Sequence, residues 1–201
     1  MVGAIPIADT FDFQKIRAEI GKGGDQLLPV FLTEEEITRD GKSIENHRSD
    51  LLKERYLSKF TAFPKVRSLF LRLKEDHIQT VLASSSKSAE LEVYKKIAKI
   101  DDLVDSEVSS EDVTQSKPAA DIFVVAVKKL HSVFPQDVVV IGDTPHDATA
   151  ARKAGLKPIG VLCGGVSDEK LRDAGCAAIY KDPEDLLNRY ETWTGAGQTG
   201  S

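Results

Sequence analysis

Residues 138–156 read VVVIGDTPHDATAARKAGL, and this stretch decides the fold. Its β-branched start predicts a buried strand that ends on Gly142 and Asp143. The alanine-rich half that follows predicts a helix with Gly155 as its C-cap. A strand that runs directly into a helix is the repeating unit of a parallel α/β fold.

Strands and helices alternate outward from this stretch. Apolar runs predict strands within residues 78–86, 101–110, 158–165 and 176–180, and amphipathic runs predict helices within 64–77, 88–100, 119–134 and 183–190. This alternation implies an α/β fold, a parallel sheet with helices on both faces. Because ligands bind beyond the carboxyl ends of such strands, residues 84–86 and 142–147 are the first candidates for a site.

Composition and charge exclude some classes of function. The chain has 201 residues and a net charge of −5, which argues against a nucleic-acid surface. No apolar run is long enough to span a bilayer, and the N-terminus lacks the basic flank of a signal peptide. The two cysteines, Cys163 and Cys176, are expected to be thiols, and we expect a cytoplasmic protein.

Asp143 and Asp147 are the strongest chemical signal. Two carboxylates four residues apart, one at a strand end and one at a helix start, can share a Mg²⁺ ion. Alternatively, Asp147 caps the helix and Asp143 closes a turn.

Ser84 and Lys117 are weaker signals when each is taken alone. Ser84 ends a strand, where a hydroxyl and backbone N–H groups can hold a phosphate, although serine is also a common N-cap. Lys117 precedes a helix, where its ammonium could neutralise phosphate charge, although most lysines are solvated surface charges.

Taken together, the motifs resemble those of a known family. The stretches VLASSSKSAEL (81–91), SSEDVTQSKPAADIF (109–123) and residues 138–156 are similar to the second, third and fourth motifs of the haloacid dehalogenase (HAD) superfamily. They look especially like its phosphoglycolate phosphatase and β-phosphoglucomutase branch. This resemblance implies a HAD-like Rossmannoid core and a Mg²⁺-dependent phosphatase of a small phosphorylated metabolite. It also implies that Ser84 and Lys117 bind the phosphoryl group, with Ser85 assisting, and that Asp143 and Asp147 hold Mg²⁺.

The resemblance also divides the chain. Residues 1–10 form an atypical N-terminal segment, 11–63 an incomplete α-helical cap, 64–192 the α/β core and 193–201 a disordered tail. The cap segment IGKGGDQLLP (20–29) is similar to the family's specificity loop. Lys22, Gly23, Gly24 and Asp25 are therefore candidates for contacting the leaving group, unless they form only an exposed turn.

One family motif is missing. The family's nucleophile lies in an Asp-x-Asp at the end of the first strand, and no Asp-x-Asp occurs in this sequence. Asp9 and Asp12 follow the apolar run VGAIPIA (2–8), but they are three residues apart and Pro6 interrupts the run. We expect this chain to be impaired or inactive as an enzyme, because the nucleophile is not evident.

The first strand, central in the family's sheet, is therefore missing or atypical, and we hypothesise that residues 2–8 fill its place imperfectly. Two alternatives to an active enzyme stay open. The chain could be a non-catalytic protein that binds a phosphorylated metabolite, or an incomplete gene product.

Overall fold

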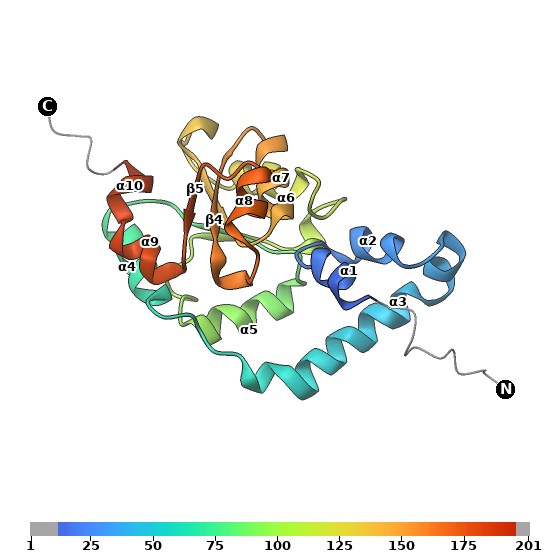
Figure 1. Cartoon of the computed structure of the whole chain (residues 1–201). Helices are drawn as coiled ribbons and strands as arrows, with labels where there is room; N and C mark the ends of the chain where they lie inside the picture. The colour runs from blue at the N-terminus through green and yellow to red at the C-terminus, as the bar shows by residue number, and fades with distance from the viewer. Residues whose placement is uncertain (1–11, 196–201) are drawn as a thin grey trace, which may run out of the picture.

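The computed structural model describes residues 12–195 of the chain (Figure 1). Parallel strands form the centre, helices cover them, and a helical segment from residues 13–59 extends to one side. Residues 1–11 and 196–201 lie outside the described part, and so does the whole of the expected N-terminal segment, residues 1–10. None of the helices within residues 12–195 is both long and apolar enough to cross a membrane.

The strands are short and all run parallel. They are β1 (Val81–Ala83), β2 (Ser106–Val108), β3 (Val139–Gly142), β4 (Lys157–Val161) and β5 (Ala178–Tyr180). They form two ladders, β1–β2 and β3–β4–β5, and within residues 12–195 no strand joins β1 to β3. The α/β class with parallel strands is confirmed, and the described strands form two separate ladders.

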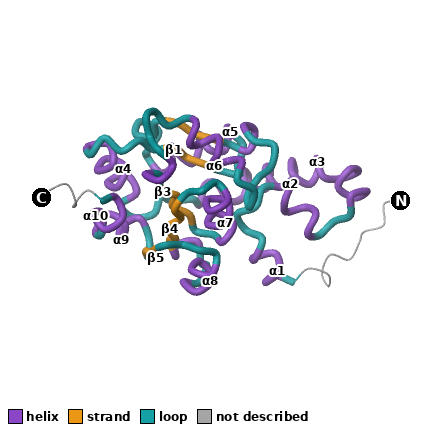
Figure 2. The backbone as a smooth tube through the Cα atoms, turned by 90° about the horizontal axis from the view of Figure 1, so that it is seen from above, coloured by secondary structure: helices purple, strands orange, loops and turns teal. Residues whose placement is uncertain are grey.

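The helices of the core alternate with these strands. They are α4 (Val66–Glu75), α5 (Ser88–Ala98), α6 (Asp121–Lys128), α7 (Pro145–Lys153), α8 (Asp168–Asp173), α9 (Pro183–Asn188) and α10 (Tyr190–Thr194), with 3-10 turns at Ser110–Asp112, Pro135–Asp137 and Leu162–Gly164. Helices α6 and α7 pack on one face around Ile122, Val140 and Ala150. Helices α4, α9 and α10 pack on the other around Leu73, Ile159 and Leu186. Both faces of the strands are therefore covered (Figure 2).

The segment before Pro64 is helical, as expected. It comprises α1 (Phe13–Ala18), α2 (Gly24–Leu27), a 3-10 turn (Leu28–Val30), α3 (Glu34–Leu51), a π-helical turn (Leu52–Tyr56) and a second 3-10 turn (Leu57–Lys59). A reciprocal capping box starts α3: Thr33 Oγ1 accepts from the Glu36 N–H at 3.3 Å, and Glu36 accepts from the Thr33 N–H at 2.8 Å.

Three expectations need correction. The helix expected over residues 119–134 ends at Lys128, and Ser132 takes a left-handed φ of 56°, which a continuing helix cannot accommodate. Helix α8 was not expected from the sequence. Trp193, assigned to a disordered tail, lies in α10, where its ring packs edge-on against Tyr190 and its N–H donates to the Leu186 carbonyl at 2.9 Å.

Candidate functional site

The candidate residues gather at the carboxyl ends of β1 and β3. Ser84 follows β1, Asp143 follows β3, Asp147 lies in the first turn of α7, and Lys117 lies in the loop before α6. Parallel strands bring such loops to one edge of the sheet, which is why residues distant in sequence meet there.

Lys117 and Asp147 form a buried ion pair. The Lys117 Nζ lies 2.6 Å from Asp147 Oδ1, and the two residues are only 8% and 6% exposed. Burying two charges costs free energy unless they are paired and hydrogen-bonded, and here they are. Lys117 is therefore a fixed charge at this edge and differs from the freely solvated surface lysines.

Asp147 also caps its own helix. Its Oδ2 accepts from the Thr144 hydroxyl at 2.6 Å and from the Thr144 N–H at 3.1 Å. The capping interpretation of Asp147 is thus correct, and both of its oxygens already have partners in the protein. Thr144 was missed as a site residue, although the Thr-x-x-Asp spacing of a capping box was visible in the sequence.

The carboxyl group of Asp143 has a different environment from that of Asp147. It is partly buried against Gly164, and no side chain within residues 12–195 donates a hydrogen bond to its carboxyl group. Burial, and then the negative charge of Asp147, raise the pKa of Asp143 above its ordinary value, and the charge of Lys117 opposes the shift only in part. A further cation beside Asp143 would relieve this repulsion.

The serines lie at the same edge without joining the ion pair. The Ser84 N–H donates to the Val108 carbonyl at 2.9 Å, and the Ser84 hydroxyl accepts from the Ser86 N–H at 3.1 Å. In the described part of the chain no hydrogen bond links Ser84 to Lys117 or Asp143. The Ser84 hydroxyl thus accepts a hydrogen bond within the turn after β1, as the side chain of an N-cap or Ser-turn residue does.

The loop between α1 and α2 packs directly onto this edge. The Ser85 hydroxyl donates to the Gly21 carbonyl at 3.4 Å, and Gly21 has a φ of +102° that favours glycine. A side chain on Gly23 would overlap Ser116, the neighbour of Lys117. The loop therefore packs closely on this edge because its glycines leave room for the side chains of Ser116 and Thr144.

Asp25 fixes the far end of this loop. Its Oδ2 accepts from the Ser116 N–H at 2.9 Å. Partial burial raises the pKa of Asp25, but the hydrogen bonds from Ser116 and Gln26 outweigh it and hold the pKa below its ordinary value. Lys22 is turned toward Glu19, with which it forms an ion pair, and Gly24 lies against Glu45.

Helix α1 makes a second contact between cap and core. The Arg17 guanidinium donates to the Gly165 carbonyl at 3.1 Å, and a ring nitrogen of His146 lies 3.0 Å from the Ala18 carbonyl. His146 lies in the first turn of α7, and its contact with Ala18 holds α1 at the carboxyl ends of β3 and β4.

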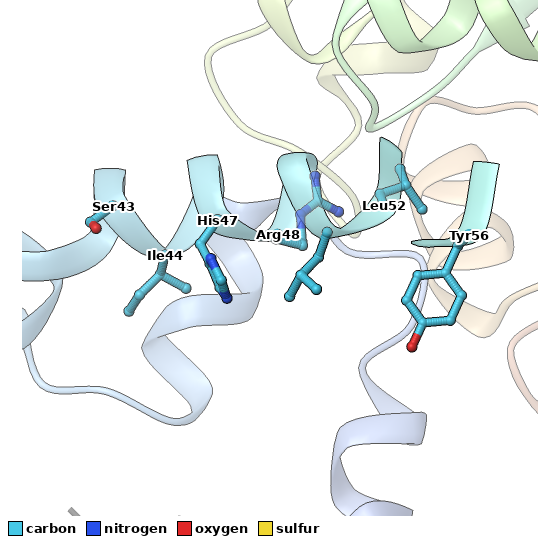
Figure 3. Close-up of a pocket in the computed structure, with 7 residues that line it drawn as sticks. Ser43, Ile44, His47, Arg48, Leu52 and Tyr56 are labelled. Atoms are coloured by element: carbon cyan, nitrogen blue, oxygen red, sulfur yellow. The ribbon is translucent and has the colours of Figure 1, made fainter. Parts of the chain in front are cut away.

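A separate hollow lies on the cap. Its volume is about 570 Å³, and Figure 3 shows the side chains of Ile44, His47 and Tyr56 projecting to it from one helical stretch. All of its lining residues come from α3 and the π-helical turn, so the hollow lies along a single helical stretch, where Ile44 is 40% and Tyr56 51% exposed. It contains none of the candidate site residues.

Fold and site together define a class of protein. A parallel α/β core carries a helical segment over the carboxyl ends of its strands, and a buried lysine and two carboxylates lie beneath that segment. The sequence profile of the haloacid dehalogenase-like hydrolase family matches residues 10–161, so the chain belongs to this family.

Individual relatives agree with this assignment. A phosphorylated carbohydrates phosphatase of Thermotoga maritima is 30% identical over 141 residues, which are 70% of this chain and 61% of that protein. A phosphoglycolate phosphatase of Mannheimia succiniciproducens is 24% identical over 177 residues, 84% of this chain and 78% of the relative. The crystal structure of a hydrolase from Pseudomonas syringae superposes with a TM-score of 0.79 at 26% identity, covering 91% of this chain and 84% of the other.

Proposed function

We propose that this chain binds the phosphoryl group of a small phosphorylated metabolite at the carboxyl ends of β1 and β3. The observation that carries the proposal is the buried Lys117 ammonium, which is held by Asp147 beside the carboxyl group of Asp143. A fixed cation at a strand edge is suited to a phosphate oxygen, because its position needs no reorganisation on binding. Relatives named as phosphatases support the same class of ligand.

Each candidate residue has a part in this proposal. Lys117 neutralises phosphate charge, Ser84 donates its hydroxyl hydrogen to a phosphate oxygen, and Ser85 assists by exchanging its bond to the Gly21 carbonyl for one to phosphate. Lys22, Gly23, Gly24 and Asp25 contact the rest of the metabolite, because their loop already packs on Ser85 and Ser116.

Mg²⁺ is the cofactor we propose for this site. No group of three or more metal-ligating side chains occurs within residues 12–195. Two carboxylates are nevertheless sufficient for Mg²⁺, which keeps several waters and takes its remaining oxygens from phosphate. Asp143 would hold the cation because no side chain within residues 12–195 donates to its carboxyl group, and Asp147 would bind directly or through water because its oxygens are already engaged. When bound, Mg²⁺ would supply positive charge to the phosphate.

Turnover is proposed to be weak or absent. Transfer through a covalent aspartyl-phosphate needs a free carboxylate nucleophile, and the sequence has no Asp-x-Asp to supply one. In the described residues Asp147 is bound to Lys117 and Thr144 and is therefore not free to attack. The same observation favours a second candidate function, a phosphometabolite-binding protein that does not catalyse hydrolysis.

Calorimetric titration with inorganic phosphate in the presence of Mg²⁺ tests the proposed binding. Lys117→Ala should weaken phosphate binding about tenfold or more, as expected for the loss of a charged hydrogen bond. The matched control is Lys128→Ala, an exposed lysine of α6. Equal phosphate affinity in a folded Lys117→Ala protein would contradict the proposal.

A further inference from the structure

Helix α3 is docked on the core through one side and carries exposed apolar residues on the other. Ser49 is buried, and its hydroxyl donates to Glu90 of α5 at 2.9 Å. Ile44 and Leu51 lie seven residues apart on one face, about 140–160° around the helix from Ser49. Figure 3 shows Ile44 projecting from that face into the hollow of about 570 Å³. We call the face that carries Ile44 and Leu51 the outer face of α3.

Charge is divided along this helical stretch. Residues 34–45 carry five carboxylates and two cationic side chains, whereas residues 46–59 carry four cationic side chains and two carboxylates. The stretch is therefore negative at its start and positive at its end. Two such stretches attract each other when they pack antiparallel, because each acidic start then meets a basic end.

Two of these charges flank the apolar pair on the outer face. Asp40 lies one turn before Ile44, and Arg55 lies one turn after Leu51. Asp40 is beyond the first turn of α3, so compensation of the helix dipole does not account for it. Its ion pair with Arg39, at 2.8 Å, is exposed to solvent and therefore weak. Arg55 is exposed and forms no ion pair within the described chain, so both charges can bind a partner.

We propose that the outer face of α3 is a dimer interface, in which α3 packs antiparallel against α3 of a second copy of the chain. A two-fold axis next to His47 places Ile44 against the partner's Leu51 and Asp40 against the partner's Arg55. Symmetry makes each of these contacts occur twice. A second copy is the occupant because it offers an acidic and a basic end at the same separation as this chain does.

The spacing of the face supports a helix as the partner. Two helices that pack along a seam need residues at alternating intervals of three and four. The outer face has this spacing at Asp40, Ile44, His47 and Leu51. His47 lies at the centre of the seam, where a polar residue can fix the register of the two helices. The hollow beside Ile44 is then filled by side chains of the partner helix.

Sedimentation equilibrium of the full chain, at concentrations across the micromolar range, tests this interface. The wild type should form a reversible dimer of modest affinity, because one helix face buries less area than a standard interface. Arg55→Asp should weaken the dimer at least about tenfold, since it replaces two attractions by two repulsions of Asp40. Lys53→Asp is the matched control: it makes the same charge change at an exposed position on the other side of the same turn.

A charge exchange makes the test specific. Asp40→Arg alone should also weaken the dimer. Combined with Arg55→Asp, it should restore the affinity to within about threefold of the wild type, because the attraction returns with its signs exchanged. Ile44→Asp should abolish the dimer, whereas Val124→Asp, at an exposed apolar position of α6, should not. Unchanged far-ultraviolet circular dichroism would show that each variant is folded.

Three results would overturn the proposal. A wild type that stays monomeric at the highest concentration has no such interface. A dimer that both Arg55→Asp and Ile44→Asp leave intact uses another surface. A chain that dimerises only after deletion of residues 1–11 would mean that this segment, and not a second copy, occupies the outer face.

Discussion

At the scale of single residues, Lys117 has two roles. It compensates the buried charge of Asp147, and it provides the positive charge of the proposed phosphate site. The two roles are linked, because the ammonium is held in place by Asp147, which is itself fixed by Thr144. Removing the ammonium therefore affects stability as well as binding.

Lys117→Met should lower the free energy of unfolding by about 3–5 kcal/mol, because Asp147 would be left buried without its counter-ion. Urea unfolding measures the change. Lys128→Met, at an exposed position, should change the same quantity by less than about 0.5 kcal/mol. Equal effects of the two substitutions would show that the Lys117–Asp147 pair is not a buried pair in solution.

Asp102 gives a prediction on acid stability. Arg67 donates to its two carboxylate oxygens at 2.6 and 2.8 Å, and these hydrogen bonds lower the pKa of Asp102 to about 2. A lowered pKa contributes stability that is complete above the unfolded value of 3.8 and is lost as the pH falls toward 2. Asp102→Asn should therefore shift the urea midpoint more at pH 5 than at pH 2, and by a modest amount since the pair is exposed to solvent. An equal shift at both pH values would contradict this cause.

At the scale of elements, α3 depends on its capping box. Thr33→Ala removes the acceptor for the Glu36 N–H and should destabilise the helix by about 1 kcal/mol, measurable as faster amide exchange in its first turns. The control is Thr38→Ala, an exposed position inside the same helix, where alanine is the better helix former. Faster exchange in Thr38→Ala than in Thr33→Ala would show that the box does not hold the helix end.

Most helices and strands could be predicted from regular patterns in the sequence. The β-branched run of β3 and the Gly155 stop after α7 depend on neighbours in sequence, and both occur where the sequence places them, with Gly155 at a φ of +75°. Helix α8 and the packing of Trp193 depend on tertiary contacts that local pattern does not encode. Leu171 of α8 is held by a cluster with Ala148 and Cys176.

The position of the candidate site could be predicted from the sequence, but the hydrogen bonds that join its residues could not. Strand ends identified the edge where Ser84 and Asp143 lie, because that rule follows from parallel topology alone. The bond from Lys117 to Asp147 and the support of Asp25 by Ser116 join residues 30 and 91 positions apart, and no local signal points to them. Residue roles in phosphate and Mg²⁺ binding stay predictions.

At the scale of the whole molecule, the cap and the core meet at the candidate site. Gly21, Asp25 and Arg17 contact the loops after β1, before α6 and after β4. The loop that would touch a metabolite is thus held by the same edge that would hold its phosphate. In the described chain Asp147 is engaged by Lys117 and Thr144, and Asp143 is proposed to hold Mg²⁺, so neither carboxylate of this edge is left to attack phosphorus.

Hydrolysis of p-nitrophenyl phosphate by the full chain, with and without Mg²⁺, tests this account most directly. We predict that the folded protein turns over little or no ester, and that Lys117→Ala leaves this low rate unchanged. Mg²⁺-dependent hydrolysis that Lys117→Ala abolishes and Lys128→Ala preserves would contradict the account. It would mean that a carboxylate nucleophile is present after all, and Asp9 and then Asp12 would be the residues to replace by asparagine.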